Sequence, residues 1–267
     1  MSVHEVKHMG EQDILFSKLG SIAHITINRA EALNALNHSV LTKLDRVLDD
    51  IEEDQAIIAA VITGAGSKAF IAGADVKEIK EAGSGRTAFI TGGQHTIYKI
   101  KKSSKVMIAA INGYALGGGL EVALMCDFRI ASEKAKLGLP EAGLGVMAGY
   151  GGTQMLPRLV GPGRAKYMIL TGAILSAREA HEIGLVDKVC PPEELNNEVT
   201  AITEKIAASG PLSIKGSKEA IDRGLALPLE EALKLELSIY DKVANSEDAE
   251  NGLSAFLEKR KPVFRGK

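Results

Sequence analysis

An apolar run followed closely by three consecutive glycines constrains the fold of this chain more than any other segment. Met107–Ile111 is apolar throughout, and Gly117–Gly119 come shortly after it. Leu120, Ala123 and Leu124 then recur at the spacing of a helix with one core-facing side. Glycine has no Cβ atom, so the backbone can turn sharply there and approach a neighbour closely. We therefore expect a strand, a tight turn and a helix that begins at or near Gly118.

Two glutamates follow turns of this kind. Glu121 comes directly after the glycines and Leu120, and Glu141 follows Pro140 in a second turn. Acid–base chemistry on a small substrate often needs two carboxyl groups at one reacting centre, one to take a proton and one to give it. The sequence therefore predicts Glu121 and Glu141 as a catalytic pair. A glycine turn with a purely structural role is the alternative interpretation.

A second glycine turn, Ala72–Asp75, comes after the apolar stretch Ile57–Ile62. The first N–H groups of a helix lack intrahelical partners and lie at the positive end of the helix dipole. The turn at Gly118 and the turn at Ala72–Asp75 could each offer one backbone N–H to the same carbonyl oxygen. Such a pair of donors is an oxyanion hole.

Strands alternate with helices over the first part of the chain, which predicts an α/β core. The expected elements are a hairpin over 14–28 that turns at Gly20-Ser21, a helix over 39–53 capped by Ser39, strands over 57–62, 106–111 and 128–131, and a helix over 87–102. Residues 1–13 are polar and are interpreted as a loose arm. Beyond Gly151 the pattern is mostly helical, and the residues at which helices could begin are Pro162, Ser176, Pro211, Pro228 and Ser246.

Composition and charge exclude several classes of function. The 267 residues carry a net charge of −2, so no field of one sign attracts nucleic acid or a membrane to the whole molecule. Cys126 and Cys190 are the only cysteines, which argues against a disulfide framework. No N-terminal segment has the pattern of a signal peptide, and no apolar run approaches the roughly 20 residues that span a bilayer. We therefore expect a cytoplasmic protein with no nucleic-acid or membrane partner.

Other reaction classes have weaker support. Thr63–Ala69 resembles a dinucleotide-binding fingerprint, and Tyr98 with Lys102 has the spacing used by short-chain dehydrogenases. That fingerprint should open a long helix, but another glycine turn interrupts the chain at Gly73. The six histidines form no metal-binding motif, so no metal site is expected. RNA binding as the main function is disfavoured because the net charge is balanced and the chain has no run of aromatic residues on which bases could stack.

Six short motifs occur in an order and at a spacing that are typical of one enzyme family. They are Glu31–Leu36, Ala72–Asp75, Asn112–Glu121, Leu139–Glu141, Gly149–Gln154 and Ala255–Lys261. On these motifs the chain resembles an enoyl-CoA hydratase of the crotonase family, from about Ile25 to the C-terminus. The resemblance implies a spiral core of repeated ββα units in residues 1–200. It also implies a C-terminal helical region, residues 201–267, that completes a homotrimer or homohexamer.

The resemblance also implies roles for individual residues. Glu121 and Glu141 match the catalytic acids, and Ala74 and Gly118 match the backbone donors to the thioester oxygen. The residues that match coenzyme A contacts are Leu33, Ala35, Ala72, Asp75, Phe256 and Lys259, the last two usually across a subunit boundary. Coenzyme A is part of the substrate in this family, so no separate cofactor is expected.

The segment after the second acid departs from the usual family pattern. Ala148 replaces a proline, Met155 replaces an arginine, and Tyr150 stands at a position that is often small or aromatic. This loop lies near the acyl end of the pocket in the family, so Tyr150 is expected to line the acyl pocket. A ring that faces the core or solvent is the alternative, because the sequence does not fix the rotamer. The expected reaction is reversible syn hydration of a short trans-2-enoyl-CoA such as crotonyl-CoA. Enoyl-CoA isomerisation and hydration of a cyclic enoyl-CoA remain alternatives, because one fold hosts several reactions.

Overall fold

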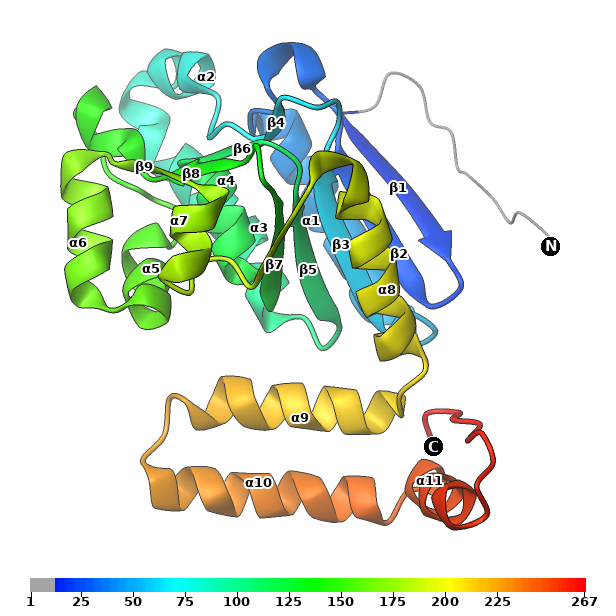
Figure 1. Ribbon diagram of the computed structural model, residues 1–267. Coiled ribbons are helices and arrows are strands. Elements are labelled where there is room, and N and C mark those ends of the chain that lie inside the picture. Colours follow the sequence, from blue (N-terminus) through cyan, green and yellow to red (C-terminus); the bar gives the residue numbers. More distant parts are fainter. Residues whose placement is uncertain (1–12) are drawn as a thin grey trace.

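The computed structural model describes residues 13–267, which form a core of two sheets with helices around them and a separate helical extension (Figure 1). The predicted loose arm lies almost entirely outside the described residues. The larger sheet has the strand order β1-β2-β3-β5-β7-β10. Its strands are β1 (Ile14–Leu19), β2 (Ile22–Ile27), β3 (Ala59–Gly64), β5 (Val106–Ile111), β7 (Phe128–Ser132) and β10 (Lys188–Cys190). Within this sheet, only the β1–β2 pair is antiparallel, and the other neighbouring strands are parallel.

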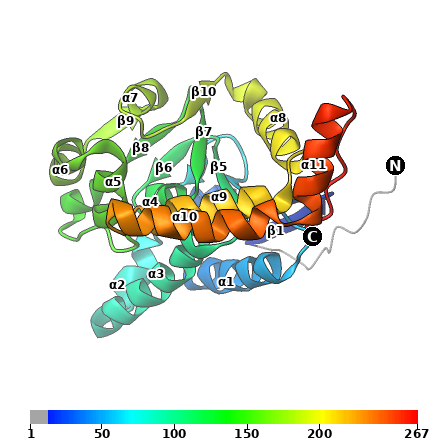
Figure 2. The ribbon, with the colours of Figure 1, turned by 90° about the horizontal axis from the view of Figure 1, so that it is seen from below.

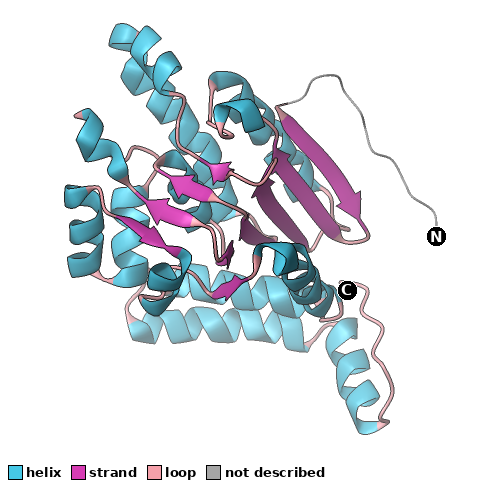
Figure 3. Cartoon of the chain, turned by 45° about the horizontal axis from the view of Figure 1, so that its top comes forward, coloured by secondary structure: helices cyan, strands magenta, loops and turns pink. Residues whose placement is uncertain are grey.

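The smaller sheet has the order β4-β6-β8-β9. Its strands are β4 (Ala69–Ile71), β6 (Tyr114–Leu116), β8 (Lys136–Gly138) and β9 (Ile174–Ser176). From β3 to β8 the strands alternate between the two sheets, so helices follow each of the successions β3–β4, β5–β6 and β7–β8. Figure 3 shows the strands of both sheets with helices on their flanks. These repeated strand–strand–helix units confirm the predicted α/β architecture.

Helices surround the two sheets and are numbered in the order of the sequence. The core helices are α1 (His38–Glu53), α2 (Val76–Glu81), α3 (Arg86–Lys102), α4 (Gly118–Met125), α5 (Gly152–Val160), α6 (Pro162–Thr171), α7 (Ala177–Glu182) and α8 (Leu195–Ala207). In the described part of the chain, four short 3-10 helices, η1 to η4, cover Ala30–Ala32, Gly83–Gly85, Pro140–Leu144 and Pro192–Glu194. The extension consists of α9 (Pro211–Gly224), α10 (Leu229–Ala244) and α11 (Glu247–Leu257).

The central strands are buried on both faces, as is usual for parallel sheets. In β5, Met107 and Ile111 belong to the main hydrophobic core. Ile108 faces the other way, into a second cluster that includes Leu195 and Val199 of α8. Successive side chains of a strand point to opposite faces, so an uninterrupted apolar run is what a strand between two cores requires.

Most of the predicted elements are confirmed, with shifts at their ends. The hairpin at Gly20, the strand over 106–111 and the helix start at Gly118 are as expected. The N-cap of α1 was predicted wrongly: Asn37 caps the helix, and its side chain accepts a hydrogen bond from Val40 N. Ser39 lies inside the helix, where its hydroxyl donates to Asp13 at 2.6 Å. The glycine-containing loop after β3 leads into β4 and opens no helix, which rules out the dinucleotide-binding arrangement.

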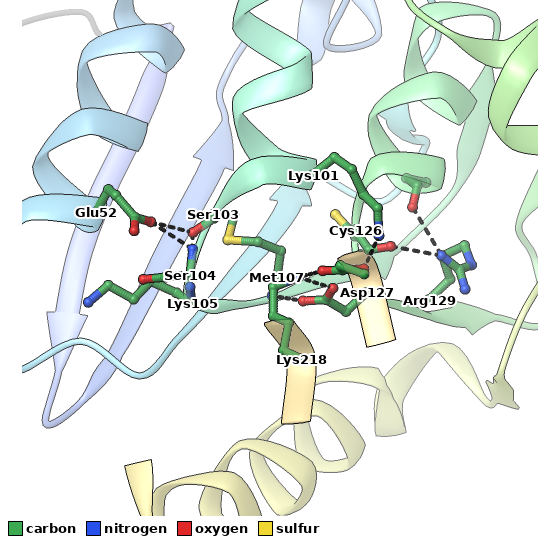
Figure 4. Close-up of polar contacts among 12 residues, drawn as sticks. Glu52, Lys101, Ser103, Ser104, Lys105, Met107, Cys126, Asp127, Arg129 and Lys218 are labelled. Carbon is green, nitrogen blue, oxygen red and sulfur yellow. Dashed lines mark hydrogen bonds and ion pairs between the residues drawn. The ribbon is translucent and has the colours of Figure 1, made fainter. Parts of the chain in front are cut away.

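The extension lies below the core, where α9 and α10 pack side by side and α11 continues at one end (Figures 1 and 2). Lys218 of α9 reaches up to the Asp127 carboxylate, which also accepts a hydrogen bond from Met107 N at 2.7 Å (Figure 4). The Lys218 side chain is only 10% exposed, and it also pairs with Asp222 at 2.9 Å. Burying a charge is costly unless it is paired, so this cluster fixes how α9 sits under the core.

Candidate active site

At each of the three consecutive glycines, a side chain would crowd a neighbouring segment. Gly117 has a φ of +51°, and a Cβ built on it would lie 2.9 Å from Oε1 of Glu141. A Cβ on Gly119 would lie 1.9 Å from the Ile71 carbonyl oxygen, so α4 could not approach β4 with a side chain there. A Cβ on Gly118 would lie 3.3 Å from the Ala74 nitrogen. The turn therefore brings one acid, one strand and a second glycine turn against the start of α4.

Two backbone N–H groups meet at this point. Gly118 is the first residue of α4, and Ala74 lies in the turn whose Gly73 has a φ of +119°. Leu36 pairs with the residues on either side of Ala74: its N–H donates to Gly73 O, and its carbonyl oxygen accepts from Asp75 N. Ala74 N takes no part in this pairing. Among the described residues, neither Ala74 N nor Gly118 N donates to a backbone carbonyl. The structure thus places the two predicted oxyanion donors next to each other, on the wall of one cavity.

The cavity has a volume of about 670 Å³ and contains both predicted acids. Glu121 is 2% exposed, and its Oε1 accepts hydrogen bonds from Tyr150 N at 2.8 Å and Gly152 N at 2.7 Å. Glu141 lies in η3 over Gly117, and its buried Oε2 has no hydrogen-bond partner within residues 13–267. One acid is therefore fixed by backbone donors, and the other keeps an oxygen free.

Burial controls the protonation of both acids. Burial raises the pKa of Glu121 to about 7, and the nearby Glu141 charge acts in the same direction. The two backbone hydrogen bonds to Glu121 oppose this rise. Burial also raises the pKa of Glu141. A carboxyl group whose pKa lies near neutrality can carry or release a proton at the working pH. The pair is therefore suited to hold one proton between two carboxyl groups.

Tyr150 lies on the cavity wall, and its ring faces the glycine turn. Its side chain is 1% exposed, and a Cβ on Gly118 would lie 3.0 Å from the ring's Cδ2. The phenolic hydroxyl is buried and has no partner among the described residues. Sequence alone left open whether the ring faces the site, the core or solvent. In the structure it is buried and lines the cavity at the same time.

Four of the residues predicted to contact coenzyme A come together near this cavity. The segment around Leu33 and Ala35 lies against the turn at Ala72 and Asp75, because Ala72 N donates to Leu33 O at 3.1 Å. Arg29 joins the two segments by donating to Ala35 O at 2.8 Å and to the Asp75 carboxylate at 3.2 Å. The Asp75 carboxylate also caps α2, so its side chain is already engaged in holding the turn.

The other two residues predicted to contact coenzyme A lie elsewhere. Phe256 is 83% exposed on α11, and Lys259 follows that helix with a φ of +55°. Neither lines the cavity, and α11 lies at the far end of the extension in Figure 1. Within one chain, therefore, the structure does not bring them to the acids.

One face of α3 lines the cavity, a role that no sequence motif had indicated. The residues of this face share helical spacing and are Arg86, Thr87, Ile90, Thr91 and Gln94. Leu144 at the end of η3 also lines it, as do Val146 and Met147 in the loop that follows. All three residues are more than half exposed in the isolated chain. The helical spacing on α3 was visible in the sequence, but nothing in it indicated which face would meet the acids.

Within residues 13–267, no group of three or more histidine, cysteine, aspartate or glutamate side chains is placed to hold a metal ion. In the same part of the chain, every helix is too short or too polar to cross a membrane.

Comparison with known proteins gives consistent matches over nearly the whole chain. The enoyl-CoA hydratase/isomerase family matches residues 17–267. A short-chain-enoyl-CoA hydratase from Clostridium acetobutylicum is 45% identical over 251 residues, which is 93% of this chain and 96% of the relative. A crotonyl-CoA hydratase from Syntrophomonas wolfei is 42% identical over 260 residues, covering 97% and 100% of the two chains. A crystal structure of an enoyl-CoA hydratase from Bacillus anthracis matches with a TM-score of 0.91 at 42% identity, over 96% of this chain and 100% of that one.

Proposed function

This chain belongs to the enoyl-CoA hydratase/isomerase family and has the crotonase fold, and we propose that it reversibly adds water to trans-2-enoyl-CoA thioesters. The observation that carries the proposal is the convergence of two buried carboxyl groups and two free backbone N–H groups on one cavity. Hydration of a conjugated thioester needs both sets, because charge develops on the carbonyl oxygen while one proton leaves water and another reaches carbon.

The first part of the mechanism is polarisation of the thioester. The substrate carbonyl oxygen accepts hydrogen bonds from Ala74 N and Gly118 N, which draws electron density away from C3. Gly118 begins α4, so the positive end of the helix dipole also faces this oxygen. Removing a donor of this kind typically costs about 10²–10³-fold in turnover. Glycine and alanine suit these positions because the donors are backbone groups.

The second part is proton transfer by the two acids. One water molecule lies between Glu121 and Glu141. Its oxygen forms the new bond to C3 while the ionised carboxylate takes its proton, and the protonated carboxyl group gives a proton to C2. The water oxygen reaches C3 and the proton reaches C2 from the same face of the double bond, so the addition is syn, and the reverse steps remove water. Assistance of this kind contributes about 10²–10⁴-fold. Coenzyme A enters as part of the substrate, and no step needs a metal or a redox group.

Short acyl chains are the preferred substrates in this proposal. Two of the relatives are named for short-chain and crotonyl substrates. In this chain the Tyr150 ring occupies the wall beside Gly118, which leaves less room for acyl carbons than a small residue would. Isomerisation, the other reaction in the family name, moves a proton between carbons and needs no water between two acids. The presence of both acids favours hydration.

The proposal also includes residues that bind coenzyme A and a surface that joins copies of the chain. Leu33, Ala35, Ala72 and Asp75 would contact the coenzyme A part of the substrate from the same chain. Exposed apolar residues on α9 to α11 and the turn between α9 and α10 support contacts with other copies in a homotrimer or homohexamer. They are Ile221, Leu225, Leu227, Leu229, Leu233, Leu237, Tyr240, Leu253, Phe256 and Leu257. In such an assembly Phe256 and Lys259 would reach the ligand of a neighbouring copy.

We also propose a spiral core over residues 1–200 and a helical region over residues 201–267. The boundary between them falls within α8, whose side chains pack against the larger sheet. We place the protein in the cytoplasm on the strength of its two unpaired, buried cysteines.

Turnover of purified protein with crotonyl-CoA tests the proposed reaction directly. Loss of the conjugated enoyl absorbance, with 3-hydroxybutyryl-CoA identified as the product, is the expected result. A chain-length series up to ten carbons measures the preference. A product whose double bond has moved without gain of water would show isomerisation instead.

A further inference from the structure

Helix α3 contains two consecutive glycines in its interior, Gly92 and Gly93. Glycine in a helix interior is about 1 kcal/mol less favourable than alanine, so a glycine there needs a reason. A Cβ on Gly92 would meet nothing within 4 Å. A Cβ on Gly93 would lie 2.6 Å from Cε1, 2.8 Å from Cζ and 2.9 Å from the hydroxyl oxygen of Tyr150. The two glycines are neighbours in sequence, but only Gly93 makes room for the ring.

The same ring touches a second glycine with its opposite edge. A Cβ on Gly118 would lie 3.0 Å from Cδ2 and 3.1 Å from Cε2 of Tyr150. The ring is therefore held between α3 on one side and the start of α4 on the other. Gly118 N is one of the two proposed donors to the substrate carbonyl, so anything that pushes the ring away from Gly93 pushes it toward the oxyanion site.

The loop that carries Tyr150 cannot easily move to relieve such a push. Tyr150 N donates to Glu121 at 2.8 Å, which ties the loop to α4. Gln94, next to Gly93 on α3, donates through Nε2 to Gly149 O at 2.9 Å. A Cβ on Gly149 would lie 2.6 Å from Cγ2 of Ile90, so the loop already rests on α3. The backbone on both sides of the ring is fixed, and a displaced ring must move within the cavity wall.

We propose that Gly93 is a specificity-determining residue of this enzyme, which sets how far the Tyr150 ring enters the acyl pocket although Gly93 itself does not line the cavity. The inference rests on the proposed function and names the device that limits acyl length. Because Gly93 would act through Tyr150, it is a positioning residue. Its effect should disappear when the ring is absent.

Four variants test this: Gly93→Ala, the matched control Gly92→Ala, Tyr150→Ala, and the double variant Gly93→Ala with Tyr150→Ala. We expect Gly93→Ala to lower kcat/KM for crotonyl-CoA at least about tenfold, since a misplacement of about 1 Å can cost on the order of 10²-fold. The ratio of kcat/KM on ten-carbon to four-carbon enoyl-CoA should fall as well. Gly92→Ala should leave both quantities unchanged. In the Tyr150→Ala background, Gly93→Ala should change neither, because the alanine methyl occupies vacated space.

Several outcomes would overturn the proposal. An equal loss from Gly93→Ala with and without the tyrosine ring would show that Gly93 acts through α3 alone. An unchanged chain-length ratio in Gly93→Ala would show that the ring does not move into the acyl pocket. The ratio of two substrates does not depend on the folded fraction, so partial unfolding of a variant does not confuse it. Tyr150→Phe should not restore Gly93→Ala, because the ring carbons that meet the new methyl remain.

A binding measurement separates this inference from the proposed reaction. The dissociation constants of butyryl-CoA and decanoyl-CoA report the room for the acyl group without any turnover. If the wild type binds acyl-CoA but does not hydrate crotonyl-CoA, the proposed reaction fails. The Gly93 inference then depends on whether Gly93→Ala weakens decanoyl-CoA binding more than butyryl-CoA binding. Equal binding changes for the two ligands would refute it.

Discussion

The backbone N–H of Tyr150 donates to Oε1 of Glu121 at 2.8 Å, so one proposed catalytic acid and the ring proposed to limit the acyl pocket belong to the same rigid unit. Gly152 N donates to the same oxygen at 2.7 Å, and a Cβ on Gly152 would lie 3.0 Å from it. The loop that follows Glu141 therefore holds the carboxyl group of Glu121 in place. Changes in this loop should affect both proton transfer and acyl selection.

Glu121→Gln and Glu141→Gln should each keep the fold and lose hydratase activity by about 10²-fold or more, because an amide neither takes nor gives the required proton. The assay follows the enoyl absorbance of crotonyl-CoA, and circular dichroism checks the fold. Glu133→Gln, at an exposed position, is the control and should keep wild-type turnover. Near-normal turnover in either active-site variant would show that its glutamate is not a catalytic acid.

Glu121→Gln should also change how stability depends on pH. Burial raises the pKa of Glu121 from 4.5 to about 7 in the folded protein, so folding favours the protonated form. That contribution is fully present below about pH 4.5 and is lost as the pH rises through 7. The glutamine variant should therefore be more stable than the wild type at pH 8, by up to about 3 kcal/mol, and should lose this advantage at pH 5.

Denaturant unfolding at the two pH values measures the difference, with Glu133→Gln as the reference for a change of surface charge. A glutamine variant that gains no stability at pH 8 would mean that Glu121 ionises in the folded protein without a burial cost.

Tyr150→Ala should raise the ratio of activity on ten-carbon enoyl-CoA to activity on the four-carbon substrate. Each newly buried methylene contributes up to about 0.8 kcal/mol, so an extended pocket should be easy to detect. Tyr150→Phe keeps the ring and should leave the ratio unchanged. It removes a buried hydroxyl without a partner, so it should leave stability unchanged or raise it by about 1 kcal/mol. An unchanged ratio in a folded alanine variant would place the limit on chain length elsewhere.

Deletion of the residues after Gly252 should weaken both assembly and coenzyme A binding, if the tail reaches a neighbouring copy. The deletion also removes Arg265 and Gly266, whose N–H groups bond the Asp248 carboxylate at 2.6 and 2.8 Å. Lys259→Ala is therefore the milder test. It should weaken coenzyme A binding while Lys261→Ala, two residues away, does not. A monomer by sedimentation velocity, with coenzyme A affinity unchanged by the deletion, would contradict this prediction.

Local pattern determined most elements of this fold. The strand over 106–111 and the helix starts at Pro162, Pro211 and Ser246 could be predicted because apolar spacing, proline and capping side chains act within one or two turns. The cap of α1 was missed because Asn37 and Ser39 are both good capping residues. Only the tertiary structure decides between them, by giving the Ser39 hydroxyl a partner in Asp13.

For the site, the sequence by itself determined the residue types and their turns: two glutamates after tight turns, and glycines where a backbone must approach. The tertiary structure decided which distant groups meet. It places Ala74 N beside Gly118, lays one face of α3 along the cavity, and holds the Tyr150 ring between Gly93 and Gly118. A side chain's rotamer depends on the segments packed around it, and those segments come from distant parts of the chain. Sequence pattern indicates which residues are neighbours along the chain. The position of the Tyr150 ring and the raised pKa of Glu121 depend instead on residues that are neighbours in space.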